Sequence, residues 1–78
     1  MITKEKVEEG KAVFFSQEWA GTAYTQGSAE LLFSWLSEDT IQIVKEVLGD
    51  RCFTVPVSDW TEMDQRAMNV ICWLTAFE

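Results

Sequence analysis

An apolar seam near the C-terminus constrains the fold of this chain more than any other feature. Six apolar residues recur there at spacings of three and four: Trp60, Met63, Ala67, Val70, Leu74 and Phe77. Such spacing places side chains along one side of an α-helix. Ser58 or Asp59 stands where an N-cap belongs, and Glu62 adds negative charge near the positive end of the helix dipole. The sequence therefore predicts a helix over about residues 59–77.

The middle of this helix is predicted to be the backbone of the core. Val70 and Leu74 lie in the central part of the seam, so we expect both side chains to be nearly inaccessible to solvent. Trp73 falls on another side of the helix, because successive residues are rotated by about 100°. It is expected to lean to the flank of the seam, where either loops of the chain or a partner would cover it.

The segment before this helix has two interpretations. In the first, Ser37 begins a helix that carries an apolar stripe over 41–48 and ends at Gly49. In the second, 41–48 pairs with 51–57 as a β-hairpin around Gly49-Asp50. Lysine and glutamate in the middle of the stripe favour the helix. Residues 52–57 are β-prone, but Pro56 lacks an amide donor, so the segment is expected to be an extended connector or an edge strand.

Two more helices are predicted in the first half of the chain. Ser28 is placed to cap a short apolar helix over 29–36, after a loop over 21–27. Thr3 is placed to cap a helix that runs to about Ala20, with Gly21 as its terminator and Gly10 costing about 1 kcal/mol inside it. Alternatively, Gly10 is a turn and a strand follows it.

Together these elements predict a mostly α fold, a compact bundle of about four short helices with an extended segment at 52–57. The alternative is an α+β fold with a small sheet from 12–16, 41–48 and 52–57. The 78 residues can enclose one small core, so 1–78 is expected to be a single globular domain. A hydrophobic content of 47% and a charged content of 24% suit such a domain and argue against a disordered tail.

The residue types available exclude most enzyme chemistry. The chain has no histidine, and its two cysteines, Cys52 and Cys72, stand twenty residues apart. These are poor material for a metal site or an activated nucleophile, and no glycine-rich phosphate loop occurs. We expect no enzyme activity, cofactor or metal; a catalyst built on two carboxylates is a distant alternative. The cysteines are expected to be small buried hydrophobes, with a disulfide between them as the alternative.

The expected location follows from the absence of two kinds of segment in the sequence. The N-terminus carries lysines with no apolar core behind them, unlike a secretory signal. The longest apolar run, residues 70–74, is far shorter than the roughly 20 residues that span a bilayer. We therefore expect a cytoplasmic protein that does not contact membranes.

Charge and aromatic residues indicate where a partner would bind. Six basic residues against thirteen acidic ones give a net charge of −7, so direct binding of nucleic acid is not expected. Four tryptophans, five phenylalanines and one tyrosine exceed what so small a core can enclose. The candidate partner-binding residues are two tryptophans and an acidic rim at the start of the last helix: Trp73, Trp35, Asp59, Glu62 and Asp64.

The leading functional hypothesis is a small acidic cytoplasmic protein-binding module that occupies a partner surface. Its most specific version is a phage-type inhibitor of a nucleic-acid-handling complex, because a negative field would steer the module to a basic site. The alternative is a self-associating structural or accessory subunit built around the apolar C-terminal helix. Salt separates the two, because a charge-steered complex weakens as salt rises and an apolar homodimer does not.

Overall fold

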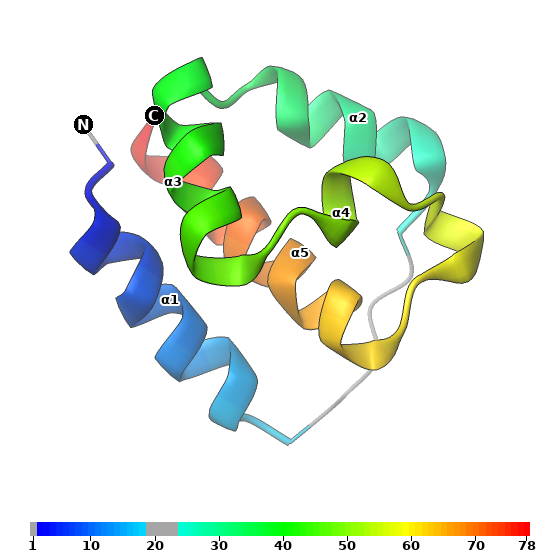
Figure 1. The fold of residues 1–78 in the computed structure, drawn as a ribbon, viewed down its shortest axis with the longest axis horizontal. Helices are drawn as coiled ribbons and strands as arrows, with labels where there is room; N and C mark the ends of the chain where they lie inside the picture. The colour runs from blue at the N-terminus through cyan, green and yellow to red at the C-terminus, as the bar shows by residue number, and fades with distance from the viewer. Residues whose placement is uncertain (1, 19–23) are drawn as a thin grey trace.

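The fold is seen in a computed structural model that describes residues 2–18 and 24–78. These residues form five α-helices and two 3₁₀ helices, with no strand among them (Figure 1). The elements are α1 (Lys4–Ser16), α2 (Gln26–Ser34), α3 (Glu38–Leu48), α4 (Arg51–Thr54), η1 (Val57–Asp59), α5 (Glu62–Leu74) and η2 (Thr75–Phe77). The predicted mostly α bundle is confirmed. The alternative sheet is wrong, because 12–16 lies in α1 and 41–48 in α3.

Helix α5 is the centre of the bundle. Figure 1 shows it between α1 on one side and α2 on the other, and α4 also packs on it. Val70 and Leu74 are fully buried, as the seam predicts. Removing such side chains from water supplies most of the stabilisation that a small domain can gain.

The buried face of α5 is wider than the predicted seam and is rotated from it. Met63 and Phe77 belong to the seam but are exposed, whereas Met68 and Ile71 outside it are fully buried. The reason is tertiary, because α1 covers one side of α5 while α2 and α4 cover others. A helix covered on several sides buries residues beyond a single stripe.

Helix α5 also begins later than predicted. Ser58 and Asp59 lie in η1, and Thr61 is the N-cap. The Thr61 hydroxyl accepts a hydrogen bond from the Asp64 amide, and the Asp64 carboxylate accepts one from the Thr61 amide. This reciprocal pair satisfies two amides that have no partner within the helix, which a cap at Ser58 would not do.

The ends of α2 and α3 follow local side-chain chemistry. Thr25 caps α2 in place of Ser28, which is instead its reciprocal partner three residues later, so the predicted loop is wrong at Gln26 and Gly27. Ser37 caps α3 as predicted, and its hydroxyl accepts from the Thr40 amide at 3.2 Å. Gly49 ends α3 with φ of 83°, a conformation that side chains other than glycine rarely adopt.

Helix α1 begins at the predicted cap, Thr3, and ends earlier than predicted. Gln17 is its extended C-cap, and the predicted terminator Gly21 lies outside the described residues. Arg66 of α5 donates to the carbonyls of Phe14 at 2.9 Å and Gln17 at 2.8 Å. The guanidinium therefore satisfies carbonyls that the end of the helix leaves without amide partners.

The predicted extended segment at 52–57 is correct only at residues 55 and 56, because Val57 already lies in η1. Val55 and Pro56 are extended, but α4 occupies the residues before them. Cys52 is buried against α5, and the Phe53 ring lies 4.6 Å from that of Phe33. These contacts outweigh the β-propensity of a short apolar run.

Candidate binding surface

Trp73 lies in the contact between α1, α5 and η2. Its ring meets Phe14 edge-on at 6.2 Å and Phe77 at 5.0 Å, measured between ring centroids. The Lys6 ammonium lies 4.8 Å from the centroid of the Trp73 ring. The ring also covers Gly10, where a Cβ atom would come within 2.8 Å of it. Trp73 is half-buried among these groups and takes part in the packing of α1 on α5. Its prediction as a partner-binding residue did not include this role.

Trp35 is the exposed tryptophan of the pair. It is the C-cap of α2 and 56% of it is accessible, while Leu31, one turn earlier, is 53% accessible. Residues four apart lie on the same side of a helix, so the two side chains form one surface, named here the α2 patch (Leu31 and Trp35). The predicted partner-binding residues include Trp35 but not Leu31. The spacing of four residues between Leu31 and Trp35 could have indicated from the sequence that the two side chains lie together.

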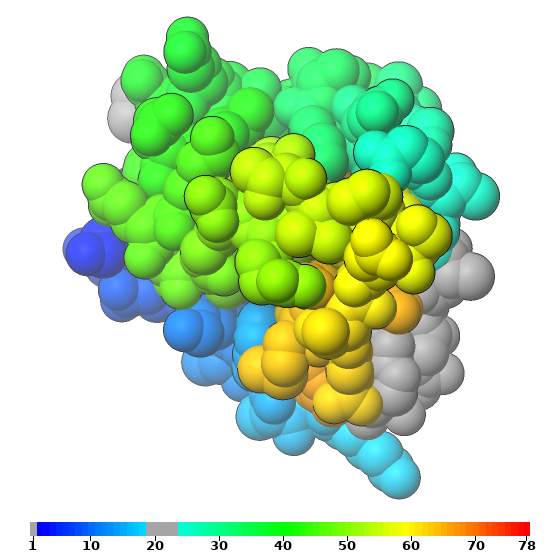
Figure 2. Space-filling model, turned by 45° about the vertical axis from the view of Figure 1, so that its right-hand side comes forward, coloured from blue at the N-terminus to red at the C-terminus, as the bar shows by residue number. Residues whose placement is uncertain are grey.

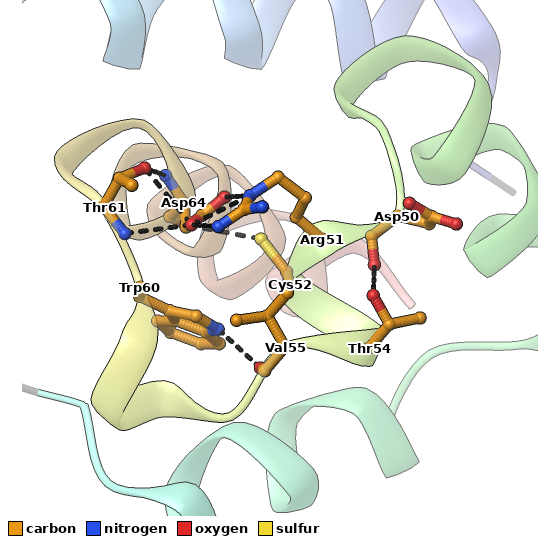
Figure 3. A network of polar contacts seen from close by, with 8 residues as sticks. All are labelled: Asp50, Arg51, Cys52, Thr54, Val55, Trp60, Thr61 and Asp64. Carbon is orange, nitrogen blue, oxygen red and sulfur yellow. Dashed lines mark hydrogen bonds and ion pairs between the residues drawn. The ribbon is translucent and has the colours of Figure 1, made fainter.

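The predicted acidic rim does not form as one surface. Asp59 and Glu62 are exposed, and Glu62 pairs with Arg66 at 3.5 Å. Asp64 is only 5% accessible, and its carboxylate points toward Arg51 (Figure 3). The structure therefore separates Asp64 from the other two as a buried group with an internal partner.

Asp64 and Arg51 form an ion pair with two parallel contacts. Arg51 Nε lies 3.1 Å from Asp64 Oδ1, and Nη2 lies 3.1 Å from Oδ2. The Thr61 amide and hydroxyl donate to the same carboxylate at 2.9 and 3.2 Å. Burial opposes ionisation of Asp64, but these hydrogen bonds and the Arg51 charge outweigh it and lower the pKa of the carboxyl below its ordinary value.

The groups around this pair are also held internally. Cys52 Sγ donates to the Asp64 carbonyl at 3.3 Å, and Trp60 Nε1 donates to the Val55 carbonyl at 2.9 Å (Figure 3). Burial, and then the negative charge of Asp64, raise the pKa of the Cys52 thiol to about 11. Cys52 is thus a protonated thiol at neutral pH, which disfavours nucleophilic chemistry there.

Most cations of the chain contact groups of the chain itself. Lys6 and Lys45 lie over aromatic rings, and Lys11 donates to the Val47 carbonyl. Both arginines form ion pairs with carboxylates of Asp64 and Glu62. Among the residues that the structure describes, Lys4 is the cation without such a contact. By contrast, twelve of the thirteen acidic residues are exposed, Asp64 being the buried one. The negative charge therefore faces solvent while much of the positive charge is engaged internally.

Three exposed acids flank the α2 patch along the chain. Glu30 precedes Leu31 on α2, and Glu38 and Asp39 form the first turn of α3, three and four residues after Trp35. Sequence reasoning placed the acidic rim at the start of the last helix and missed these residues. Their proximity to Trp35 in the sequence was the available signal.

Neither a membrane-crossing helix nor a metal-ligand cluster is present in the described part of the chain. None of its helices is both long and apolar enough to cross a bilayer. No group of three cysteine or acidic side chains converges there as metal ligands would. Both cysteines are free thiols, Cys52 buried and Cys72 exposed. Comparison with known proteins finds no matching family, no similar curated protein and no similar solved structure.

Proposed function

We propose that this protein is a small acidic binding module that occupies a surface of another protein through the α2 patch. The observation that carries the proposal is the exposure of Leu31 and Trp35, two large apolar side chains one helical turn apart. Tryptophan is enriched among the residues that dominate binding energy, because it buries a large area at low entropic cost. Of the two predicted tryptophans, the proposal keeps Trp35 as the anchor and leaves Trp73 out.

The acidic surface defines the chemistry of the partner. Glu30, Glu38 and Asp39 would form the polar rim of the contact, around an apolar centre. A rim of one sign speeds association with a surface of the opposite sign and disfavours other partners. The partner is therefore expected to present an apolar pocket within a basic surface.

A basic surface of this kind is typical of proteins that hold nucleic acid. The most specific form of the proposal is that the module covers the nucleic-acid site of such a protein and so inhibits it. Exposed Cys72 is compatible with a reducing compartment, and we propose the cytoplasm as the location. The proposal requires no catalytic step and no direct contact between the module and nucleic acid.

Site-specific crosslinking tests the proposal. A photoreactive amino acid such as p-benzoylphenylalanine in place of Leu31 should capture the partner in the source cell. The matched control places the same group at Val13, which is 43% accessible on α1. We expect one basic protein to be captured from position 31 and not from position 13. Capture of the same proteins from both positions would contradict the assignment of the patch.

Self-association through the same patch is the alternative outcome. Two copies would each bring a net charge of −7, so charge repulsion opposes a dimer and is relieved by salt. Sedimentation equilibrium in low and high salt distinguishes the two functions. A monomer in both supports the proposal, and a dimer that strengthens as salt rises supports the self-associating subunit.

A further inference from the structure

A groove on the opposite part of the bundle from α2 combines an apolar floor with two basic side chains. It has a volume of about 340 Å³ and lies between α1, the turn from α3 into α4, and the start of α5. In Figure 2 the blue, yellow-green and orange surfaces of these segments adjoin. Its lining residues are Lys11, Phe15, Leu48, Gly49, Asp50, Arg51, Met63, Asp64 and Ala67.

The apolar part of the groove comes from three helices. Phe15 of α1, Leu48 of α3 and Met63 of α5 supply it, and Met63 is 54% accessible there. Burying such side chains under a ligand is favourable because it removes apolar surface from water. A methionine lining is also adaptable, because its unbranched side chain can follow the shape of the ligand.

The polar part of the groove is Arg51, whose guanidinium already contacts Asp64 along one edge. Asp64 takes the Nε and Nη2 contacts of Arg51, and the side chain is still 57% accessible. A guanidinium carries five donors, so Nη1 and one Nη2 hydrogen remain for a further acceptor. The Asp64 pair orients this free edge in advance, which lowers the entropic cost of holding a ligand there.

Charge balance indicates what the free edge would bind. The Arg51 charge is already matched by buried Asp64, and the Asp50 carboxylate points away from the pair (Figure 3). Lys11 is the cation of the groove that no carboxylate of the described residues contacts, and its ammonium uses one of three donors on the Val47 carbonyl, at 3.3 Å. The two cations and two carboxylates of the lining cancel formally, so a monocarboxylate adds one negative charge, whereas a phosphate or dicarboxylate would add up to two.

We propose that this groove binds a small monocarboxylate with an apolar body. The carboxylate would lie between the free edge of Arg51 and the Lys11 ammonium, and the body would lie on Phe15, Leu48 and Met63. Charge-assisted hydrogen bonds to a guanidinium are roughly twice as strong as neutral ones, so the carboxylate should dominate selectivity. This site is distinct from the α2 patch and does not depend on the proposed function.

Titration with 4-phenylbutyrate, followed by NMR of the full chain, tests the site. We expect saturable shifts at Phe15, Leu48 and Met63 with a Kd of about 1 mM, as befits a probe of this size. The uncharged analogue 4-phenylbutanol should bind at least about fivefold more weakly. Equal binding of the two probes, or linear shifts without saturation, would overturn the proposal.

Two substitutions locate the binding within the groove. Arg51→Lys keeps a charge for Asp64 but removes the free edge, and should weaken phenylbutyrate by about fivefold or more without unfolding the chain. Met63→Glu adds an exposed negative charge to the floor and should abolish binding. The control Val13→Ala, on another face of α1, should leave the Kd unchanged. Unchanged affinity in both groove variants would place the probe elsewhere and refute the site.

Discussion

Replacement of Gly10 by alanine tests how closely α1 approaches α5. The added Cβ would lie 2.8 and 2.9 Å from two carbons of the Trp73 ring and 2.9 Å from Val70 Cγ1. The ring cannot move freely, because Phe14 and Phe77 hold it from two sides. Glycine at this position is therefore required by packing, although it is a poor helix former.

Two opposing effects set the size of the change. Alanine in the interior of a helix is favoured over glycine by about 1 kcal/mol. Overpacking of a core contact costs typically about 1–3 kcal/mol. We expect Gly10→Ala to lower the free energy of unfolding by about 1 kcal/mol, the difference between the midpoint of the second range and the first.

Gly27 provides the matched control for this change. It also lies in a helix, near the start of α2, but apart from its chain neighbours and the backbone of its own helix no atom lies within 4 Å of the position its Cβ would take. Gly27→Ala should therefore raise the free energy of unfolding, by about 0.5 kcal/mol. The same substitution is thus expected to have opposite signs at the two sites.

Urea unfolding followed by far-UV circular dichroism measures both variants. In a Trp73→Phe background the contacts with the indole ring should be relieved, so Gly10→Ala should lose part of its cost there, while the contact with Val70 Cγ1 remains. If Gly10→Ala stabilises the protein as much as Gly27→Ala does, then α1 does not pack on Trp73 this closely and the description of the α1–α5 contact is wrong.

Three further predictions concern titration and thiol reactivity. The pKa of the Asp64 carboxyl is lower in the folded chain than in the unfolded chain. Its stabilising contribution is therefore present above about pH 4 and is lost as the pH falls through the folded pKa. The free energy of unfolding of Asp64→Asn, measured in urea, should depend less on pH in acid than that of the parent. Burial raises the pKa of Tyr24, the single tyrosine, to about 12, so tyrosinate absorbance should titrate near pH 12. The free energy of unfolding should fall between about pH 10 and pH 12, because the unfolded chain loses this proton first. A titration midpoint near pH 10 would contradict the burial of Tyr24. Ellman's reagent should modify exposed Cys72 quickly and buried Cys52 only when the chain unfolds, and rapid reaction of both thiols would refute the packing of α4.

Helix termini could be predicted from the sequence where the capping contacts are local. Thr3, Ser37 and Gly49 act within four residues of their own position, so the residue types suffice to identify them. The start of α2 shows the limit of this reasoning. Thr25 and Ser28 are both good capping residues, and only their mutual hydrogen bonds decide which one is the cap.

The buried face of α5 and the roles of its polar residues depend on contacts distant in sequence. Met63 fits the apolar spacing but is 54% accessible, whereas Met68 is fully buried. Asp64 was grouped with surface acids because its partner Arg51 lies thirteen residues away. Trp73 is half-buried because Gly10 and Phe14 of α1 pack against it. Spacing within one helix does not specify which neighbours it will meet.

The central claim, that the α2 patch is a docking surface, is tested most directly by the affinity of the captured partner for Trp35→Ala. We expect this variant to bind about thirtyfold more weakly or worse, as for other tryptophan anchors, with its thermal midpoint within about two degrees of the parent. Val13→Ala, at a residue that is 43% accessible on α1, should bind as the parent does. If Trp35→Ala retains the parent affinity within about twofold, or if Val13→Ala loses as much, the α2 patch is not the docking surface.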